Sequence, residues 1–130
     1  GEGNGGVIYP ASHYGRDALV GVGLFLSHFV AEGKSMTGLK ATYPQYFISK
    51  NKLTLSPDMD VDKILEGLKK KYASEEITDI DGVKIDFKDG WVHLRKSNTE
   101  PIIRVYSESK NEDAANQLAE EVIKVAKSLY

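Results

Sequence analysis

Short segments in which apolar residues alternate follow one another closely between residues 77 and 106. Turn residues separate them, with Asp81-Gly82 after the first segment and Asp89-Gly90 after the second. Asp-Gly pairs between alternating segments are typical of tight β-hairpin turns. Because hairpins join neighbouring antiparallel strands, the sequence predicts an antiparallel sheet. The predicted strands are Ile77–Ile80, Val83–Phe87, Trp91–Leu94 and Ile102–Tyr106.

Two helices and one further strand complete the predicted domain. Residues 60–73 show helical periodicity, and a final helix begins after Asn111 with one apolar stripe. Gln45–Leu55 alternates enough for a strand, which we expect to bulge or bend at Lys50–Lys52. We therefore predict an α+β fold, with a mostly antiparallel sheet of four to five strands and two helices on one face. The stripe of the final helix is Ala115, Leu118, Ala119, Val122, Ile123, Ala126 and Leu129.

An almost uninterrupted apolar run, Ala18–Val30, lies upstream of this domain. It predicts a helix with Asp17 as its first cap and Gly33 just past its end. A membrane helix is not expected, because a bilayer span needs about 20 apolar residues. The run is apolar on nearly every helical face, and such a helix is normally buried. We predict that it packs against a second copy of the chain or leaves an exposed apolar patch.

The segment from Arg95 to Arg104 joins two predicted strands and has the composition of an anion-binding loop. Its two arginines offer planar forks of donors that fit phosphate oxygens. Ser97, Asn98 and Thr99 add side-chain and backbone donors. Alternation places Arg104 on the less buried face of its strand. The same loop residues are also typical of an ordinary turn, so spacing alone leaves both interpretations open.

Two other polar features suggest ligand binding but have simpler structural explanations. The alternating acidic cluster Asp58–Asp62 resembles metal-ligand spacing, yet it lies where acidic residues cap a helix and oppose its dipole. We favour capping and predict no metal site in this chain. His93 shares a strand face with Arg95 and could approach a phosphate, although a polar residue on an open sheet face is the commoner case.

Composition limits the number of domains and argues against nucleic acid as a partner. A chain of 130 residues with 41% hydrophobic content is about one domain. Its net charge of −2 offers no basic field for nucleic acid, and Lys69–Lys71 is explained more simply as a cluster at a helix C-terminus. The sequence has no cysteine and shows no signal peptide, so we expect a cytoplasmic location.

Arg95-x-Ser97-Asn98-Thr99-Glu100-Pro101-x-x-Arg104 resembles the phosphate-binding loop in the C-terminal domain of the α-D-phosphohexomutases. This family includes phosphoglucomutase, phosphomannomutase and phosphoglucosamine mutase. Upstream, Gly1-Glu2-Gly3-Asn4-Gly5-Gly6 resembles the sugar-binding loop of the family's third domain, usually Gly-Glu-x-Ser-Gly-His. The two matches occur in the family's order, and the final helix lies where the family has one. The resemblance therefore covers nearly the whole chain.

The resemblance implies a domain organisation. Residues 1–34 would be the C-terminal remnant of the sugar-binding third domain, residues 35–44 a connector or hinge, and residues 45–130 the complete phosphate-binding fourth domain. In the four-domain enzymes the phosphoserine and the Mg²⁺ ligands would lie elsewhere. This chain would then contain no catalytic residue and would be inactive alone.

The resemblance also implies the activity of the parent enzyme. A phosphoryl group moves reversibly between O1 and O6 of a hexose, through a phosphoserine and a hexose 1,6-bisphosphate intermediate, with Mg²⁺ as cofactor. The expected partner of this chain is a hexose phosphate, with no nucleic acid and no membrane. The residues that would bind the non-reacting phosphate are Arg95, Ser97, Asn98, Thr99 and Arg104.

The sugar-binding part of the resemblance departs from the usual pattern. Glu2 would accept hydrogen bonds from sugar hydroxyls, and Asn4 would replace a serine contact. Gly6 stands where histidine is common. The choice among glucose, mannose and glucosamine therefore stays open. Without the downstream motif, the same glycine-rich segment would be explained as a flexible terminus.

A function from another class is the alternative. A sheet covered by two helices on one face also serves as an autonomous module that binds anions or nucleic acid. Sheets that bind RNA usually present adjacent aromatic residues on the open face, where this chain offers mainly Trp91 and Tyr106 beside acidic neighbours. The sequence therefore favours the phosphohexomutase assignment.

Overall fold

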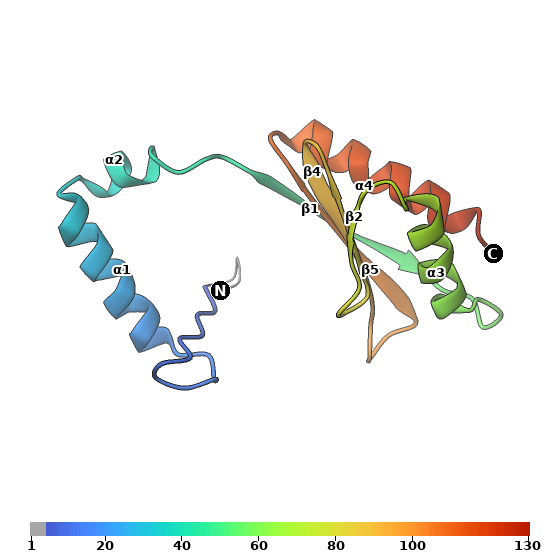
Figure 1. Cartoon of the computed structure of the whole chain (residues 1–130), viewed down its shortest axis with the longest axis horizontal. Coiled ribbons are helices and arrows are strands. Elements are labelled where there is room, and N and C mark those ends of the chain that lie inside the picture. The colour runs from blue at the N-terminus through green and yellow to red at the C-terminus, as the bar shows by residue number, and fades with distance from the viewer. Residues whose placement is uncertain (1–4) are drawn as a thin grey trace. The chain divides into compact units, whose positions relative to one another are not determined.

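The computed structural model describes residues 5–130, and contacts within the chain divide it into two compact units with a boundary between Pro44 and Gln45. The second unit contains an antiparallel sheet of five strands in the order β1-β5-β4-β3-β2 (Figure 1). The predicted α+β fold is confirmed. The strands are β1 (Phe47–Thr54), β2 (Glu76–Thr78), β3 (Val83–Phe87), β4 (Gly90–Lys96) and β5 (Ile102–Ser109).

The first strand pairs more regularly than the sequence predicts. Its eight residues pair with β5 without interruption, from Phe47 opposite Ser109 to Thr54 opposite Ile102. The predicted bulge at Lys50–Lys52 is therefore wrong. The polar residues fit the pleat because the two lysines lie on the exposed side, while Asn51, between them, donates to the Ser49 hydroxyl at 2.9 Å.

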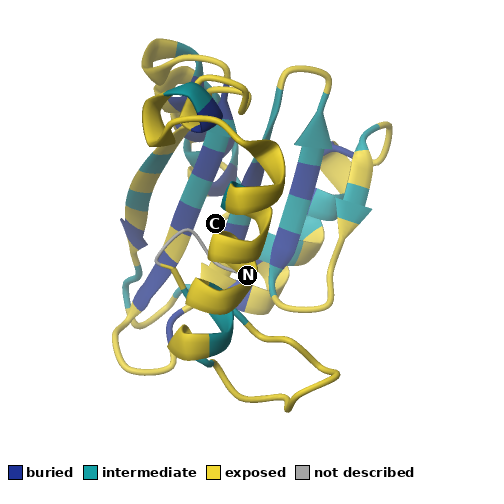
Figure 2. Cartoon of the chain, turned by 90° about the vertical axis from the view of Figure 1, so that its left-hand side faces the viewer, coloured by how far each residue is buried: buried dark blue, intermediate teal, exposed yellow. Residues whose placement is uncertain are grey.

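Helices α3 (Val61–Lys71) and α4 (Glu112–Lys127) pack on one face of the sheet. Asp60 caps α3 by accepting from the backbone N–H groups of Asp62 and Lys63, so the capping interpretation of the acidic cluster is confirmed. Asn111 caps α4 through Ala114 N at 2.8 Å. Residues of β3, β4 and β5 alternate between this core and the open face, as the bands in Figure 2 show. The sheet and helix residues with no exposed surface are Ile64, Leu68, Ile85, Val92, Leu94, Ile103, Val105, Ser107, Ala119, Val122 and Ala126.

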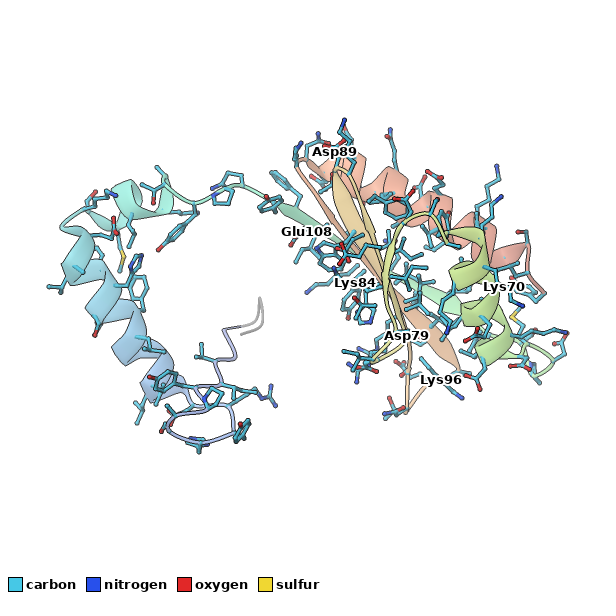
Figure 3. All side chains as sticks on the ribbon, in the orientation of Figure 1. Lys70, Asp79, Lys84, Asp89, Lys96 and Glu108 are labelled. Atoms are coloured by element: carbon cyan, nitrogen blue, oxygen red, sulfur yellow. The ribbon has the colours of Figure 1, made fainter. Side chains whose placement is uncertain are left out.

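Successive hairpins place two turns at the same end of the sheet. The β2–β3 turn and the β4–β5 loop lie at one end, because each connection reverses the chain, and the β3–β4 turn lies at the other. Figure 3 shows Asp79 and Lys96 toward the first end and Asp89 at the opposite end. The segment between β2 and β3 therefore borders the loop that carries the anion-binding motif.

The first unit contains helices α1 (Ala18–Glu32) and α2 (Met36–Lys40). Asp17 caps α1 through Val20 N at 3.0 Å, and this bond is the main cause that lowers the pKa of the Asp17 carboxyl. Gly33 ends the helix at φ +62°. Both caps are as the sequence predicts. No residue of α1 is buried, and among the described residues no helix is long and apolar enough to cross a membrane.

Gly82 permits the tight β2–β3 turn, and replacing it should destabilise the sheet. Its φ is +77°, and an added Cβ would lie 2.1 Å from the carbonyl oxygen of Leu94. We expect Gly82→Ala to lower the free energy of unfolding by about 1–3 kcal/mol. Urea unfolding followed by the fluorescence of Trp91, the single tryptophan, measures this. The control Lys88→Ala, in the exposed β3–β4 turn, should change it by less than about 0.5 kcal/mol. Equal effects would contradict the steric argument.

Self-association through α1 stays a prediction. Leu19 and Val30 are 84% and 77% exposed, which leaves apolar surface for a second copy to cover. We expect the wild-type chain to show a concentration-dependent increase in mass by sedimentation equilibrium. The double variant Leu19→Glu/Val30→Glu should stay monomeric, whereas the control Ser12→Glu, in an exposed loop, should associate normally. A wild-type monomer that binds no hydrophobic dye at high concentration would show the prediction to be wrong.

Candidate anion-binding site

Arg95 and Arg104 lie directly opposite each other on neighbouring strands. Arg95 belongs to β4, Arg104 belongs to β5, and the antiparallel register makes them cross-strand partners. On its other side Arg104 is the partner of Lys52 in β1. Because cross-strand partners share a face, three cations form a row across the open face of the sheet. All three residues are exposed.

This row is unfavourable for the sheet by itself. Like charges directly opposite each other destabilise a strand pair by an amount of the order of 0.2–1 kcal/mol. A bound anion would remove that repulsion and could accept hydrogen bonds from both guanidinium groups. The arrangement therefore favours binding of an anion with several oxygens, although it lowers the stability of the sheet.

The loop between the two arginines is closed by its own backbone. Ser97 N donates to Ile102 O at 3.0 Å, and Ile102 N donates to Glu100 O at 2.8 Å. Ser97 is only 9% exposed, and its hydroxyl oxygen accepts a hydrogen bond from Thr99 N at 3.4 Å. Within the described part of the chain, the N–H groups of Asn98 and Glu100 have no acceptor. Such backbone donors are available to an anion.

The predicted phosphate-binding residues surround one cavity of about 350 Å³. The structure thus brings together all five of them, although they come from two strands and a loop. Glu2 and Asn4, the predicted sugar-binding residues, lie outside the described residues. The cavity is lined by His93, Arg95, Lys96, Ser97, Asn98, Thr99, Arg104 and Tyr106.

Two carboxylates accompany the arginines. Asp81 Oδ2 lies 2.9 Å from Arg95 Nε, and Glu100 Oε2 lies 3.6 Å from Arg104 Nη2. Both pairs are largely exposed, so each contributes little to stability. The two pairs differ in geometry, because Arg95 is contacted at its inner nitrogen and Arg104 at a terminal one.

His93, Lys96 and Tyr106 extend the site beyond the predicted set. His93 and Tyr106 are cross-strand partners, one step along the same face from the two arginines. The sequence already places His93 on the face of Arg95, and the same period-two alternation could have identified Tyr106, two positions after Arg104. Lys96 continues β4 into the loop and also borders the cavity.

Comparisons with known proteins agree with the fold and the motif. Residues 52–125 match the family model described as "Phosphoglucomutase/phosphomannomutase, C-terminal domain". The chain is 39% identical over 126 residues to a phosphoglucosamine/phosphogalactosamine mutase of Sulfurisphaera tokodaii. It is 40% identical over 127 residues to a phosphoglucomutase/phosphomannomutase of Thermococcus kodakarensis. These alignments cover 95% and 96% of this chain, which spans 28% and 27% of the relatives.

A solved structure shares the fold. It is a phosphoglucomutase/phosphomannomutase family protein from Burkholderia thailandensis, with a TM-score of 0.62 and 23% sequence identity. The match covers 94% of this chain and 27% of that one. At this level of identity, the likeness concerns the fold alone.

The opposed arginines generate a prediction about stability. In low-salt buffer without phosphate, Arg104→Gln should leave the free energy of unfolding unchanged or raise it by up to about 1 kcal/mol, because it removes a repulsion. Added phosphate should stabilise the wild type and the control Lys70→Gln, but stabilise Arg104→Gln much less. Urea unfolding with and without phosphate measures both effects. A variant that is less stable than wild type and equally stabilised by phosphate would contradict the assignment.

Proposed function

This chain belongs to the phosphoglucomutase/phosphomannomutase family, and from that premise we propose that it binds the non-reacting phosphate of a hexose phosphate. It would do so as the C-terminal part of a phosphohexomutase. The observation that carries the proposal is the cross-strand pair of Arg95 and Arg104, both of which line the loop cavity.

The geometry explains how such a phosphate would be held. Each guanidinium can donate two parallel hydrogen bonds to phosphate oxygens, and the loop adds hydroxyl and backbone donors. Lys96 adds a third positive charge at the cavity. A phosphate monoester carries a charge of about −1.5 to −2 at pH 7, which balances much of this charge. Binding should therefore weaken with salt.

The role of this site in the proposed reaction is positioning. A phosphoryl group would move between O1 and O6 of the hexose, through a phosphoserine and a hexose 1,6-bisphosphate. The phosphate held here takes no part in bond-making, but it would fix the far end of the sugar while the near end reacts. Orientation of this kind accounts for a large part of catalysis of phosphoryl transfer.

The Mg²⁺ ion proposed for the parent enzyme does not fit the residues described here. Among residues 5–130, no group of three His, Cys, Asp or Glu side chains is placed to hold a metal ion. The acidic residues before α3 lie at its N-terminus, where the Asp60 carboxylate caps the helix. No step of the reaction is therefore assigned to a metal in this chain.

The hexose that binds is a matter of proposal, because the relatives differ in the sugar that their names give. The curated relatives carry names for glucosamine, galactosamine, glucose and mannose phosphates. We propose that Glu2 binds sugar hydroxyls and that Asn4 helps to select among these sugars.

An autonomous nucleic-acid-binding module is less well supported. The open-face aromatic residues are already engaged, because Lys84 Nζ lies 5.6 Å from the centroid of the Trp91 ring and Lys50 Nζ lies 5.9 Å from that of Tyr106. Trp91 Nε1 also donates to Glu108 at 3.0 Å. Stacking of bases on these rings would require both lysines to move.

The proposed function is tested by titrating glucose 1-phosphate and glucose 6-phosphate into the chain and following amide chemical shifts. The wild type should show shifts in residues 95–104. Arg104→Ala should weaken binding by at least about tenfold, because it loses a charge-assisted contact of about 1.5–3 kcal/mol. The control Lys70→Ala removes the same charge from α3 and should bind like the wild type. Equal affinities for all three proteins, or shifts confined to other regions, would refute the phosphate-binding role.

A further inference from the structure

We propose that Asp81, in the turn between β2 and β3, is a positioning residue for the anion site. It would hold Arg95 so that the two terminal amino groups of the guanidinium face the cavity. Asp81 lies outside the Arg95–Arg104 loop and does not line the cavity. The proposal rests on the proposed function only in that phosphate is taken as the ligand.

The first observation is the place where Asp81 meets Arg95. Its carboxylate oxygen lies 2.9 Å from Nε, the inner nitrogen of the guanidinium. A guanidinium can meet an oxyanion through the edge that contains Nε or through the edge formed by the two terminal nitrogens. With Nε beside Asp81, the terminal edge is the one left for an oxyanion in the cavity.

The second observation is that Asp81 also contacts His93 through a different atom. His93 Nε2 lies 2.6 Å from the Asp81 carbonyl oxygen. A carbonyl oxygen can only accept, so Nε2 must carry the proton in this hydrogen bond. One turn residue therefore contacts two side chains that line the cavity, one through its side chain and the other through its backbone.

The third observation is that the turn is built to come this close. At Gly82 an added Cβ would lie 3.0 Å from Arg95 Cα and still closer to the Leu94 carbonyl. On the other flank, Asp79 pairs with Lys69 of α3 at 3.1 Å. This exposed ion pair contributes little to stability, so the close approach of the turn to β4 depends on Gly82 and not on Asp79.

The opposite role for Asp81 makes a different prediction. If Asp81 acted only through its negative charge, it would compete with the anion, and removing it would tighten anion binding. If it positions Arg95, removing it weakens binding even though the site becomes more positive. The two roles therefore predict opposite signs for one measurement.

The test uses the whole 130-residue chain and inorganic phosphate as the probe. We expect Asp81→Ala to weaken phosphate binding about two- to five-fold, the range that an exposed ion pair supports. Asp79→Ala is the matched control. Asp79 carries the same charge and lies two residues from Asp81, but its carboxylate contacts Lys69 instead of Arg95. It should leave the affinity unchanged or slightly increase it. Tighter binding by both variants would overturn the proposal.

A second readout separates this proposal from the proposed function. The Nε–H resonance of Arg95, assigned by its loss in Arg95→Lys, should shift or broaden in Asp81→Ala and stay in place in Asp79→Ala. Asp81→Asn keeps an acceptor oxygen and should restore most of the wild-type signal. If the wild type binds no phosphate, the proposed function fails while this signal still decides the role of Asp81. An Arg95 resonance insensitive to Asp81→Ala would overturn the positioning role.

Discussion

The register between β4 and β5 is the constraint on which the site depends. It places Arg95 opposite Arg104, and the core holds it there because Ile103 and Val105 are fully buried on the other face of β5. A slip of one residue would turn Arg104 toward the helices and expose its apolar neighbours. Burial on one face of the sheet therefore fixes the spacing of charges on the other. The buried core on one face offsets the repulsion between the two cations on the other.

The alternation of hairpins explains why a distant turn takes part in this site. Connections at one end of an antiparallel sheet come from alternate hairpins, so the β2–β3 turn lies beside the β4–β5 loop. Gly82 brings that turn against β4, where Asp81 reaches Arg95 and His93. The anion site is thus assembled by sheet topology as much as by its own loop.

Local patterns predicted the elements well because their causes are local. The Asp-Gly turns, the caps at Asp60 and Asn111 and the exposed face of Arg104 all follow from residues a few positions apart. The regular pairing of β1 was missed because it depends on distant elements: β5 pairs with the whole strand, and Ser49 donates to Asn116 of α4. The contact of Asp81 with Arg95 was missed for the same reason, since it joins residues of two hairpins. The predicted roles of Glu2 and Asn4 concern residues outside those described.

A crystal structure of the chain grown with glucose 6-phosphate tests the central claim most directly. The account predicts the phosphate in the loop cavity, within hydrogen-bond distance of the terminal nitrogens of Arg95 and of the Arg104 guanidinium, with Asp81 still beside Arg95 Nε. The sugar should extend away from the loop. A cavity that stays empty at saturating ligand, or a phosphate bound elsewhere on the chain, would contradict the account.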